Sequence, residues 1–142
     1  MANDVHLTFA GRLGTDVELK ELTGGQLVAS FRVASTPRRV KDGAWTDGAT
    51  TWHTVKAWNR LARHAAASLR SGDPVVVHGR LVAEEWTTPA NEVMSRYVVV
   101  ASSLGHDLSH GTSTFTRASA AVTAQSSQGM GDQVAPAAPD AA

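Results

Sequence analysis

The stretch TTWHTVKAWNRLARHAAASLRSGDPVVVHGRL (residues 50–81) decides the fold, because it reads as a strand, a helix and a second strand. In residues 50–58, aromatic or polar side chains alternate with side chains that are candidates for the inward face, as expected of a half-buried strand. The second strand is predicted over residues 73–86, starting just after Pro74 with a run of valines.

Between these strands lies the one clear helix of the chain, predicted over residues 59–72. Asn59 is a suitable N-cap, and Gly72 suits the stop. Leu61, Ala65 and Leu69 share one helical face, which we expect to cover the core.

The rest of the first 108 residues is also strand-like. We predict strands at residues 4–14, 26–35 and 96–104, a short run at 16–22 closed by Gly24-Gly25, and loops at 36–49 and 87–95. The chain thus has three main strands, one short helix and two more strands. A lone helix between the third and fourth strands predicts an all-β fold, a five-stranded Greek-key barrel of the OB type.

The composition changes near Ser109, so we divide the chain into a folded domain, residues 1–108, and a tail, residues 109–142. The tail is built from Ala, Ser, Thr, Gly, Gln and Pro and is predicted to be disordered, because it has too little apolar surface to offset its ordering entropy. Whether residues 105–118 add a strand or clamp stays open.

Composition narrows the class of protein. With no cysteine in 142 residues, thiolate metal sites and disulfides are excluded. We see no signal peptide and no apolar run long enough for a membrane, and expect a cytoplasmic, nucleoid-associated protein. Thirteen basic and thirteen acidic residues give zero net charge, which argues against a strong electrostatic binder but not against a local basic groove.

Two tryptophans stand six residues apart in the strand at 50–58. On a pleated strand Trp52 and Trp58 share one face with Lys56, while Val55 and Ala57 face the other way. That face is either core or a platform for a flat, negatively charged ligand. Because lysine is seldom buried and the opposite face already offers a compact inward side, we favour the platform. A third tryptophan, at position 86, ends another strand, and a fourth, at 45, lies in a predicted flexible loop.

The basic candidates are solvated surface charges when taken one by one. As a set they are more informative, since Arg32, Lys56 and Arg80 lie on three predicted strands with non-core parity and can meet in one groove. The full set is Arg12, Arg32, Arg38, Arg39, Lys41, Lys56 and Arg80.

Signals for catalysis are weak, and we expect no enzyme, no cofactor and no metal. No nucleophile elbow or phosphate-binding loop occurs in the sequence. His53 and His78 are able to meet across strands, but a two-histidine metal site has no obvious third ligand. A small hydrolase or metal protein at these histidines therefore stays as a minor alternative.

Four segments together resemble bacterial single-stranded DNA-binding protein over residues 4–108: LTFAGRLGTDVELKEL, VASFRVASTPR, residues 50–81 and EEW. The resemblance implies an OB-fold that assembles as a homotetramer and binds single strands without reading sequence, in replication, recombination or repair. It places the stacking aromatics at Trp52, Trp58 and Trp86. The DNA-binding residues we expect are these three tryptophans with Lys56, Arg32, Arg39, Arg80 and Arg12.

Three departures from the family pattern stand out. Arg39 aligns near a position where the family has a further stacking aromatic, and Glu84 and Glu85 occupy a strand that is often basic. The chain ends VAPAAPDAA, with Asp140 as the one acidic side chain and no terminal Pro-Phe, so tail-mediated recruitment of other proteins is not implied. These features are similar to a second, short-tailed actinobacterial paralogue. The alternative is an OB-fold interaction or oligomerisation module with weak or no DNA binding, and RNA binding stays open.

Overall fold

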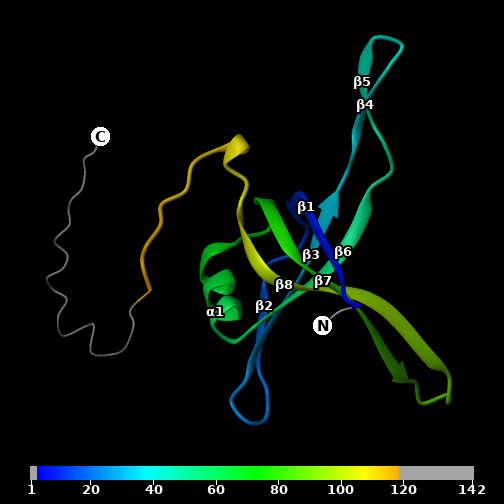
Figure 1. Ribbon diagram of the computed structural model, residues 1–142, viewed down its shortest axis with the longest axis vertical. Helices are drawn as coiled ribbons and strands as arrows, with labels where there is room; N and C mark the ends of the chain where they lie inside the picture. Colours follow the sequence, from blue (N-terminus) through cyan, green and yellow to red (C-terminus); the bar gives the residue numbers. More distant parts are fainter. Residues whose placement is uncertain (1–2, 119–142) are drawn as a thin grey trace, which may run out of the picture. The chain divides into compact units, whose positions relative to one another are not determined.

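The computed structural model describes residues 3–118, over which the chain forms eight strands, one α-helix and one short 3-10 helix (Figure 1). Five strands are long and three are short. The elements are β1 Val5–Leu13, β2 Glu18–Glu21, β3 Leu27–Ser35, β4 Arg38–Lys41, β5 Ala44–Asp47, β6 Thr51–Trp58, α1 Asn59–Ser68, β7 Pro74–Thr87, β8 Val93–His106 and η1 Leu108–His110.

The five long strands pair in a closed cycle. The main sheet has the order β1-β7-β8-β6-β3-β2, and an additional pairing between β1 and β3 closes it. β6 and β8 are parallel, and every other pairing in this sheet is antiparallel. The expected all-β class, with one helix between the third and fourth long strands, is confirmed. The short run predicted at residues 16–22 is β2, added at the edge of β3.

The interior of the closed sheet is filled mainly by valines at alternate strand positions. Val33, Val55, Val75 and Val77 are fully buried, and Phe31 packs in the same cluster. Each such side chain contributes roughly 1.5–3 kcal/mol when it leaves water. Because successive strand residues point to opposite faces, burying these positions turns their neighbours outward.

Helix α1 packs Ala65 and Leu69 onto this core, and Leu61 lies partly buried against it, as the predicted apolar face requires. Its amino end differs from the prediction. Trp58 takes the N-cap position, and no side chain in the described part of the chain caps the helix there. Asn59 has a φ of 55° and its Oδ1 accepts a hydrogen bond from the backbone N–H of Leu27 at 3.2 Å, so its amide serves β3 instead.

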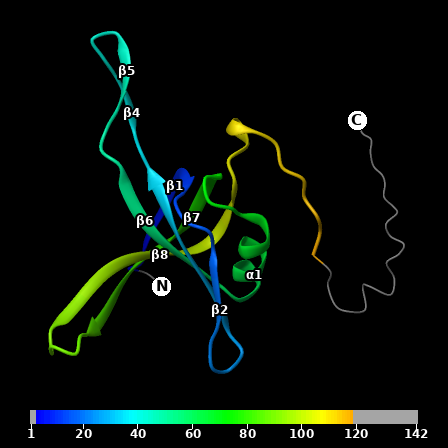
Figure 2. The same cartoon turned by 180° about the vertical axis from the view of Figure 1, so that it is seen from behind.

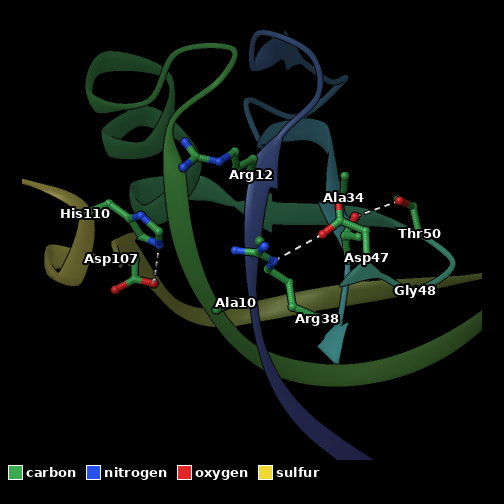
Figure 3. A pocket seen from close by; sticks show the side chains of 11 residues that line it. Ala10, Arg12, Ala34, Arg38, Asp47, Gly48, Thr50, Asp107 and His110 are labelled. Atoms are coloured by element: carbon green, nitrogen blue, oxygen red, sulfur yellow. Dashed lines mark hydrogen bonds and ion pairs between the residues drawn. The ribbon is translucent and has the colours of Figure 1, made fainter. Parts of the chain in front are cut away.

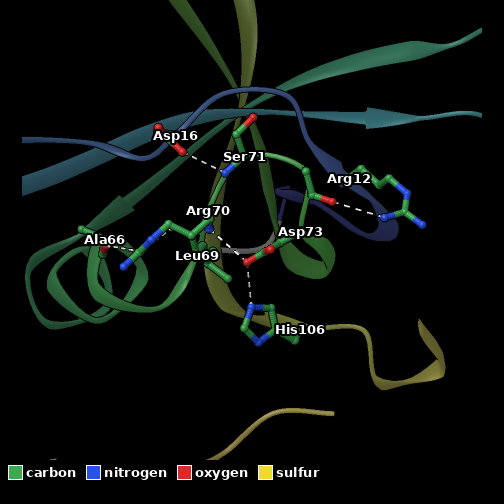
Figure 4. Close-up of polar contacts among 9 residues, drawn as sticks. Arg12, Asp16, Ala66, Leu69, Arg70, Ser71, Asp73 and His106 are labelled. Carbon is green, nitrogen blue, oxygen red and sulfur yellow. Dashed lines mark hydrogen bonds and ion pairs between the residues drawn. The ribbon is translucent and has the colours of Figure 1, made fainter. Parts of the chain in front are cut away.

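The carboxyl end of α1 also comes earlier than predicted, at Ser68, and Gly72 lies in the turn beyond it with a φ of 93°. Figure 4 shows how this turn is held. Asp73 accepts from the backbone N–H of Arg70 at 3.0 Å and pairs with Nε2 of His106 at 3.0 Å. The hydrogen bond from the backbone N–H of Arg70, and to a smaller extent that from His106, holds the pKa of Asp73 below its usual range. These bonds join the turn to the end of β8.

The segment predicted as a loop at residues 36–49 is instead a β-hairpin, in which β4 pairs with β5. Asp42 and Gly43 form its turn with φ values of 55° and 78°, the left-handed pair that a tight hairpin turn needs. Trp45 lies on β5 opposite Val40, so its placement in a flexible loop was wrong. Figures 1 and 2 show this hairpin, which we call the β4–β5 arm, projecting away from the closed sheet.

A second projection is made by the distal parts of β7 and β8, here called the β7–β8 arm (Figures 1 and 2). The two strands pair from Val75–His106 out to Thr87–Val93, so the predicted loop at 87–95 shrinks to residues 88–92.

The compact unit that contains the closed sheet runs to Thr112. After β8 ends at His106, the described residues add only the short helix η1 and no further strand. Most of the tail predicted to be disordered, residues 119–142, lies outside the described residues. Within residues 3–118 the search for a helix of membrane-spanning length and hydropathy finds none.

Candidate nucleic-acid interface

The outward face of β6 carries the two tryptophans that the sequence singled out. The Trp52 side of the strand is open, with Trp52 50% exposed and Trp58 37% exposed. On the other side Val55 and Ala57 are completely buried. The predicted outward orientation of the rings is therefore confirmed, and it follows from the pleat once Val55 is fixed in the core.

Trp52 lies in a defined environment. Its ring passes close to the backbone of Gly14, where an added Cβ would come within 2.4 Å of Cζ3. The guanidinium carbon of Arg32 stands 5.0 Å from the centroid of the same ring. Because Arg32 pairs with Thr54 and Trp52 pairs with Ala34, the two side chains are diagonal neighbours on adjacent strands.

The same diagonal pairing of arginine and tryptophan occurs twice more. On the β4–β5 arm Arg38 stands 5.6 Å from the centroid of Trp45. On the β7–β8 arm Arg96 stands 5.8 Å from the centroid of Trp86, which is 44% exposed. Each guanidinium lies within the range of a cation–π contact. Sequence reasoning missed Arg96 altogether, although the register of β7 against β8 would have revealed it.

Lys56 is not a free cation. Its Nζ donates to Oε2 of Glu84 at 2.7 Å, and Arg96 Nε donates to the other carboxylate oxygen at 3.3 Å. The side chains of Lys56 and Glu84 are 21% and 31% exposed, so this bridge is partly shielded from water. The hydrogen bond from Lys56, more than that from Arg96, holds the pKa of Glu84 below its usual range.

The bridge also shows that Trp52 and Trp86 belong to one side of the sheet. Glu84 and Trp86 point to the same side of β7, because they are two residues apart. Since Glu84 reaches Lys56, that side is continuous with the outward face of β6. We call this surface, defined by Trp52, Lys56, Trp58, Glu84, Trp86, Arg32, Arg80 and Arg96, the outer face.

The remaining predicted cations are more scattered. Arg80 is exposed on β7, in one row with Val100 and Lys56, and so joins the outer face. Arg12 lies opposite Ala34 and donates through Nη1 to the carbonyl of Gly72 at 3.2 Å. Arg39 is exposed on β4, in the β4–β5 arm, and is not brought to the outer face.

A pocket of about 690 Å³ lies between β1, η1 and the base of the β4–β5 arm (Figure 3). Its acidic groups are paired, Asp47 with Arg38 at 3.2 Å and Asp107 with His110 at 3.8 Å. The pocket borders β3 beside Trp52 through Ala34. Its lining is Ala10, Gly11, Arg12, Ala34, Thr36, Arg38, Asp47, Gly48, Thr50, Asp107 and His110.

The two histidines considered for a metal site do not come together. His53 stacks on Phe9, with 4.0 Å between ring centroids, and burial lowers its pKa. His78 contacts Thr8, which points to the opposite side of β1 from Phe9. Over residues 3–118 no group of three or more histidine, cysteine or acidic side chains is placed to hold a metal ion.

The similarity to known proteins covers the folded part of the chain. Residues 2–107 match the model of the single-strand binding protein family. Single-stranded DNA-binding protein 1 of Streptomyces coelicolor is 41% identical over 120 residues, which cover 81% of this chain and 74% of that protein. The single-stranded DNA-binding protein of Corynebacterium glutamicum is 36% identical over 107 residues, 74% of this chain, and the chain spans only 48% of that relative.

A solved structure is also similar, the crystal structure of a small single-stranded DNA-binding protein from Streptomyces coelicolor. It superimposes with a TM-score of 0.67 at 36% sequence identity and covers 77% of this chain and 99% of its own.

Proposed function

The chain belongs to the single-strand binding protein family, and on that premise we propose that it binds single-stranded DNA on the outer face without reading sequence. Trp52, Trp58 and Trp86 stack unpaired bases. Phosphates lie against Arg32 and Arg80 on this face, and Arg12 and Arg39 meet the strand where it leaves the face. Lys56, which is already paired with Glu84, contributes least to phosphate neutralisation.

The observation that carries this proposal is the exposure of three indole rings on one side of the main sheet. Exposed tryptophans cost free energy in water, and a stacked base recovers roughly 1–3 kcal/mol per ring. Every base offers a flat face, whereas sequence readout needs hydrogen-bonding groups directed at base edges. A surface of indoles and cations therefore favours single strands of any sequence.

The β4–β5 arm extends this chemistry beyond the predicted site. Trp45 is 63% exposed and carries Arg38 as its diagonal neighbour, the same combination as Trp52 with Arg32. We place Trp45 among the stacking residues, so that a strand leaving Trp52 passes the pocket at the arm's base and continues along the arm.

The decisive experiment is a fluorescence titration of the full chain with oligo-dT and with a duplex of equal length at two salt concentrations. Trp52→Ala should weaken oligo-dT binding by at least about 1 kcal/mol, close to a fivefold rise in Kd. The matched control is Tyr97→Ala, because Tyr97 is 69% exposed but points to the other side of the β7–β8 arm. Equal affinities for wild type and Trp52→Ala would contradict stacking at this ring.

We further propose a homotetramer, which lines up several outer faces along one strand and raises avidity. The rival role is an oligomerisation module, and the internal neutralisation of Lys56 by Glu84 is the observation in its favour. Light scattering gives the mass, and a gel shift at low salt gives the binding. A stable tetramer that fails to shift oligo-dT would establish the rival. Replication, recombination and repair are all compatible cytoplasmic roles.

A further inference from the structure

A carboxylate occupies the centre of the proposed DNA-binding face. One carboxylate oxygen of Glu84 accepts a hydrogen bond from Lys56 at 2.7 Å, and the other accepts one from Arg96 at 3.3 Å. Both cations thus have an anionic partner before any ligand arrives. The carboxylate of Glu84 lies on the same strand as Trp86 and links β7 to β6, the strand that carries Trp52.

The bridge has the chemistry of a phosphate contact. Two oxygens sharing one negative charge accept from an ammonium and a guanidinium, as two phosphate oxygens would. Glu84 and Lys56 are less than a third exposed, so their attraction is screened less than that of a surface pair. Because its pKa is lowered by Lys56 and then by Arg96, Glu84 stays ionised at neutral pH.

We propose that Glu84 is a selectivity determinant of this face, which withholds Lys56 and Arg96 from phosphates so that binding depends on unpaired bases. The inference rests on the proposed function and deepens it. Duplex DNA presents phosphates but keeps its bases stacked on one another. It therefore makes few favourable contacts with a face whose central cations are already paired. Single strands still gain the stacking free energy of the indoles.

The salt dependence of DNA binding is set by the number of ions that are released or taken up when the DNA binds. When a phosphate displaces Glu84 from Lys56, the phosphate releases a counterion but the freed carboxylate takes up a cation. The net release is therefore small, and the salt dependence is shallow. Once Glu84 is neutral, two additional phosphates can release counterions, which steepens the slope of log K against log salt by about 1.8 for duplex and about 1.4 for single strands.

The test compares Glu84→Gln with Glu85→Gln in the full chain, using oligo-dT and a duplex of equal length at 50 and 200 mM salt. Glu85 is the matched control, because it is the next residue of β7, points to the other side opposite Ser95, and has no ion-pair partner among residues 3–118. Both variants change the net charge equally.

We expect Glu84→Gln to tighten duplex binding roughly tenfold or more at 50 mM salt and to steepen both slopes. Because the duplex slope gains about 0.4 more than the single-strand slope, the preference for single strands should fall about 1.7-fold more at 50 mM than at 200 mM salt. Glu85→Gln should change each Kd by less than about twofold. Equal shifts in the two glutamine variants, or an unchanged single-strand preference in Glu84→Gln, would overturn the proposal.

A second arm keeps the result independent of folding defects. In the wild-type background Lys56→Gln should lower the affinity for oligo-dT by less than about threefold, because Lys56 is already neutralised by Glu84. In the Glu84→Gln background the same substitution should lower the affinity clearly more. Equal costs would overturn the proposal even if Glu84→Gln melted early. If neither wild type nor any variant binds oligo-dT, the proposed function itself fails, which is a separate outcome.

Discussion

The ring of Trp52 lies so close to Gly14 that a Cβ at that glycine would come within 2.4 Å of Cζ3 and 2.9 Å of Cη2. Gly14 follows β1 and hydrogen-bonds through its N–H to the carbonyl of Arg32 at 2.7 Å. The orientation of the most exposed indole on β6 therefore depends on a hydrogen atom in place of a side chain on a neighbouring segment.

Gly14→Ala should displace the Trp52 ring without unfolding the chain, since the contact is with the far end of a side chain. We expect oligo-dT affinity to fall by up to about 1 kcal/mol and the tryptophan emission to shift. Gly105→Ala is the control, because nothing lies within 4 Å of an added Cβ there. A Gly14→Ala variant that binds as Gly105→Ala does would show that the ring's position is unimportant.

Gly79→Ala should act on stability instead. An added Cβ at Gly79 would stand 2.2 Å from the carbonyl oxygen of Val100 on β8, and backbone yields far less readily than a side chain. Gly79 is buried, and the register of β7 against β8 shifts between His78 and Gly79. We expect a loss of about 1–3 kcal/mol or more, seen as a lower Tm in circular dichroism. A Tm equal to that of Gly105→Ala would contradict the β7–β8 packing described here.

Trp45→Ala tests the reach of the β4–β5 arm. Because the arm projects from the closed sheet, a short oligonucleotide can bind the outer face without touching it. We expect the substitution to leave the Kd of a short oligo-dT nearly unchanged and to weaken a longer one by about 1 kcal/mol. Val40→Ala, the cross-strand neighbour of Trp45, controls for damage to the hairpin. An effect that is independent of oligonucleotide length would exclude the arm from the path.

Stability should respond to pH through His53. Burial lowers its pKa below the ordinary value of about 6.5, so the unfolded chain binds a proton there that the folded chain resists. This contribution is fully present above pH 6.5 and is lost as the pH falls from there through the folded pKa. His53→Phe keeps a ring against Phe9 and should flatten the dependence of Tm on pH between 7 and 5. His64→Gln, on the exposed side of α1, should leave the profile unchanged.

The sequence was sufficient for the positions of the long strands along the chain and for the outward orientation of Trp52. Both follow from alternation, which depends only on the pleat and the apolar residues at every second position. The β4–β5 arm was missed because its strands bury no face, although the Asp42-Gly43 turn was visible. The ion bridge was missed for another reason. Lys56 and Glu84 are 28 residues apart, and only the register of three strands brings them together.

The closed sheet is held at two short seams. β1 meets β3 through two residue pairs, ending at Leu13–Val33, and β6 meets β8 through two, Val55–Val99 and Lys56–Val100. By contrast, β7 and β8 stay paired along nearly their whole length. Breathing motions should therefore begin at the seams, and amide protons there should exchange with solvent sooner than those of the central β7–β8 ladder. One seam includes Lys56, so the part of the molecule that opens most readily is also part of the proposed binding face.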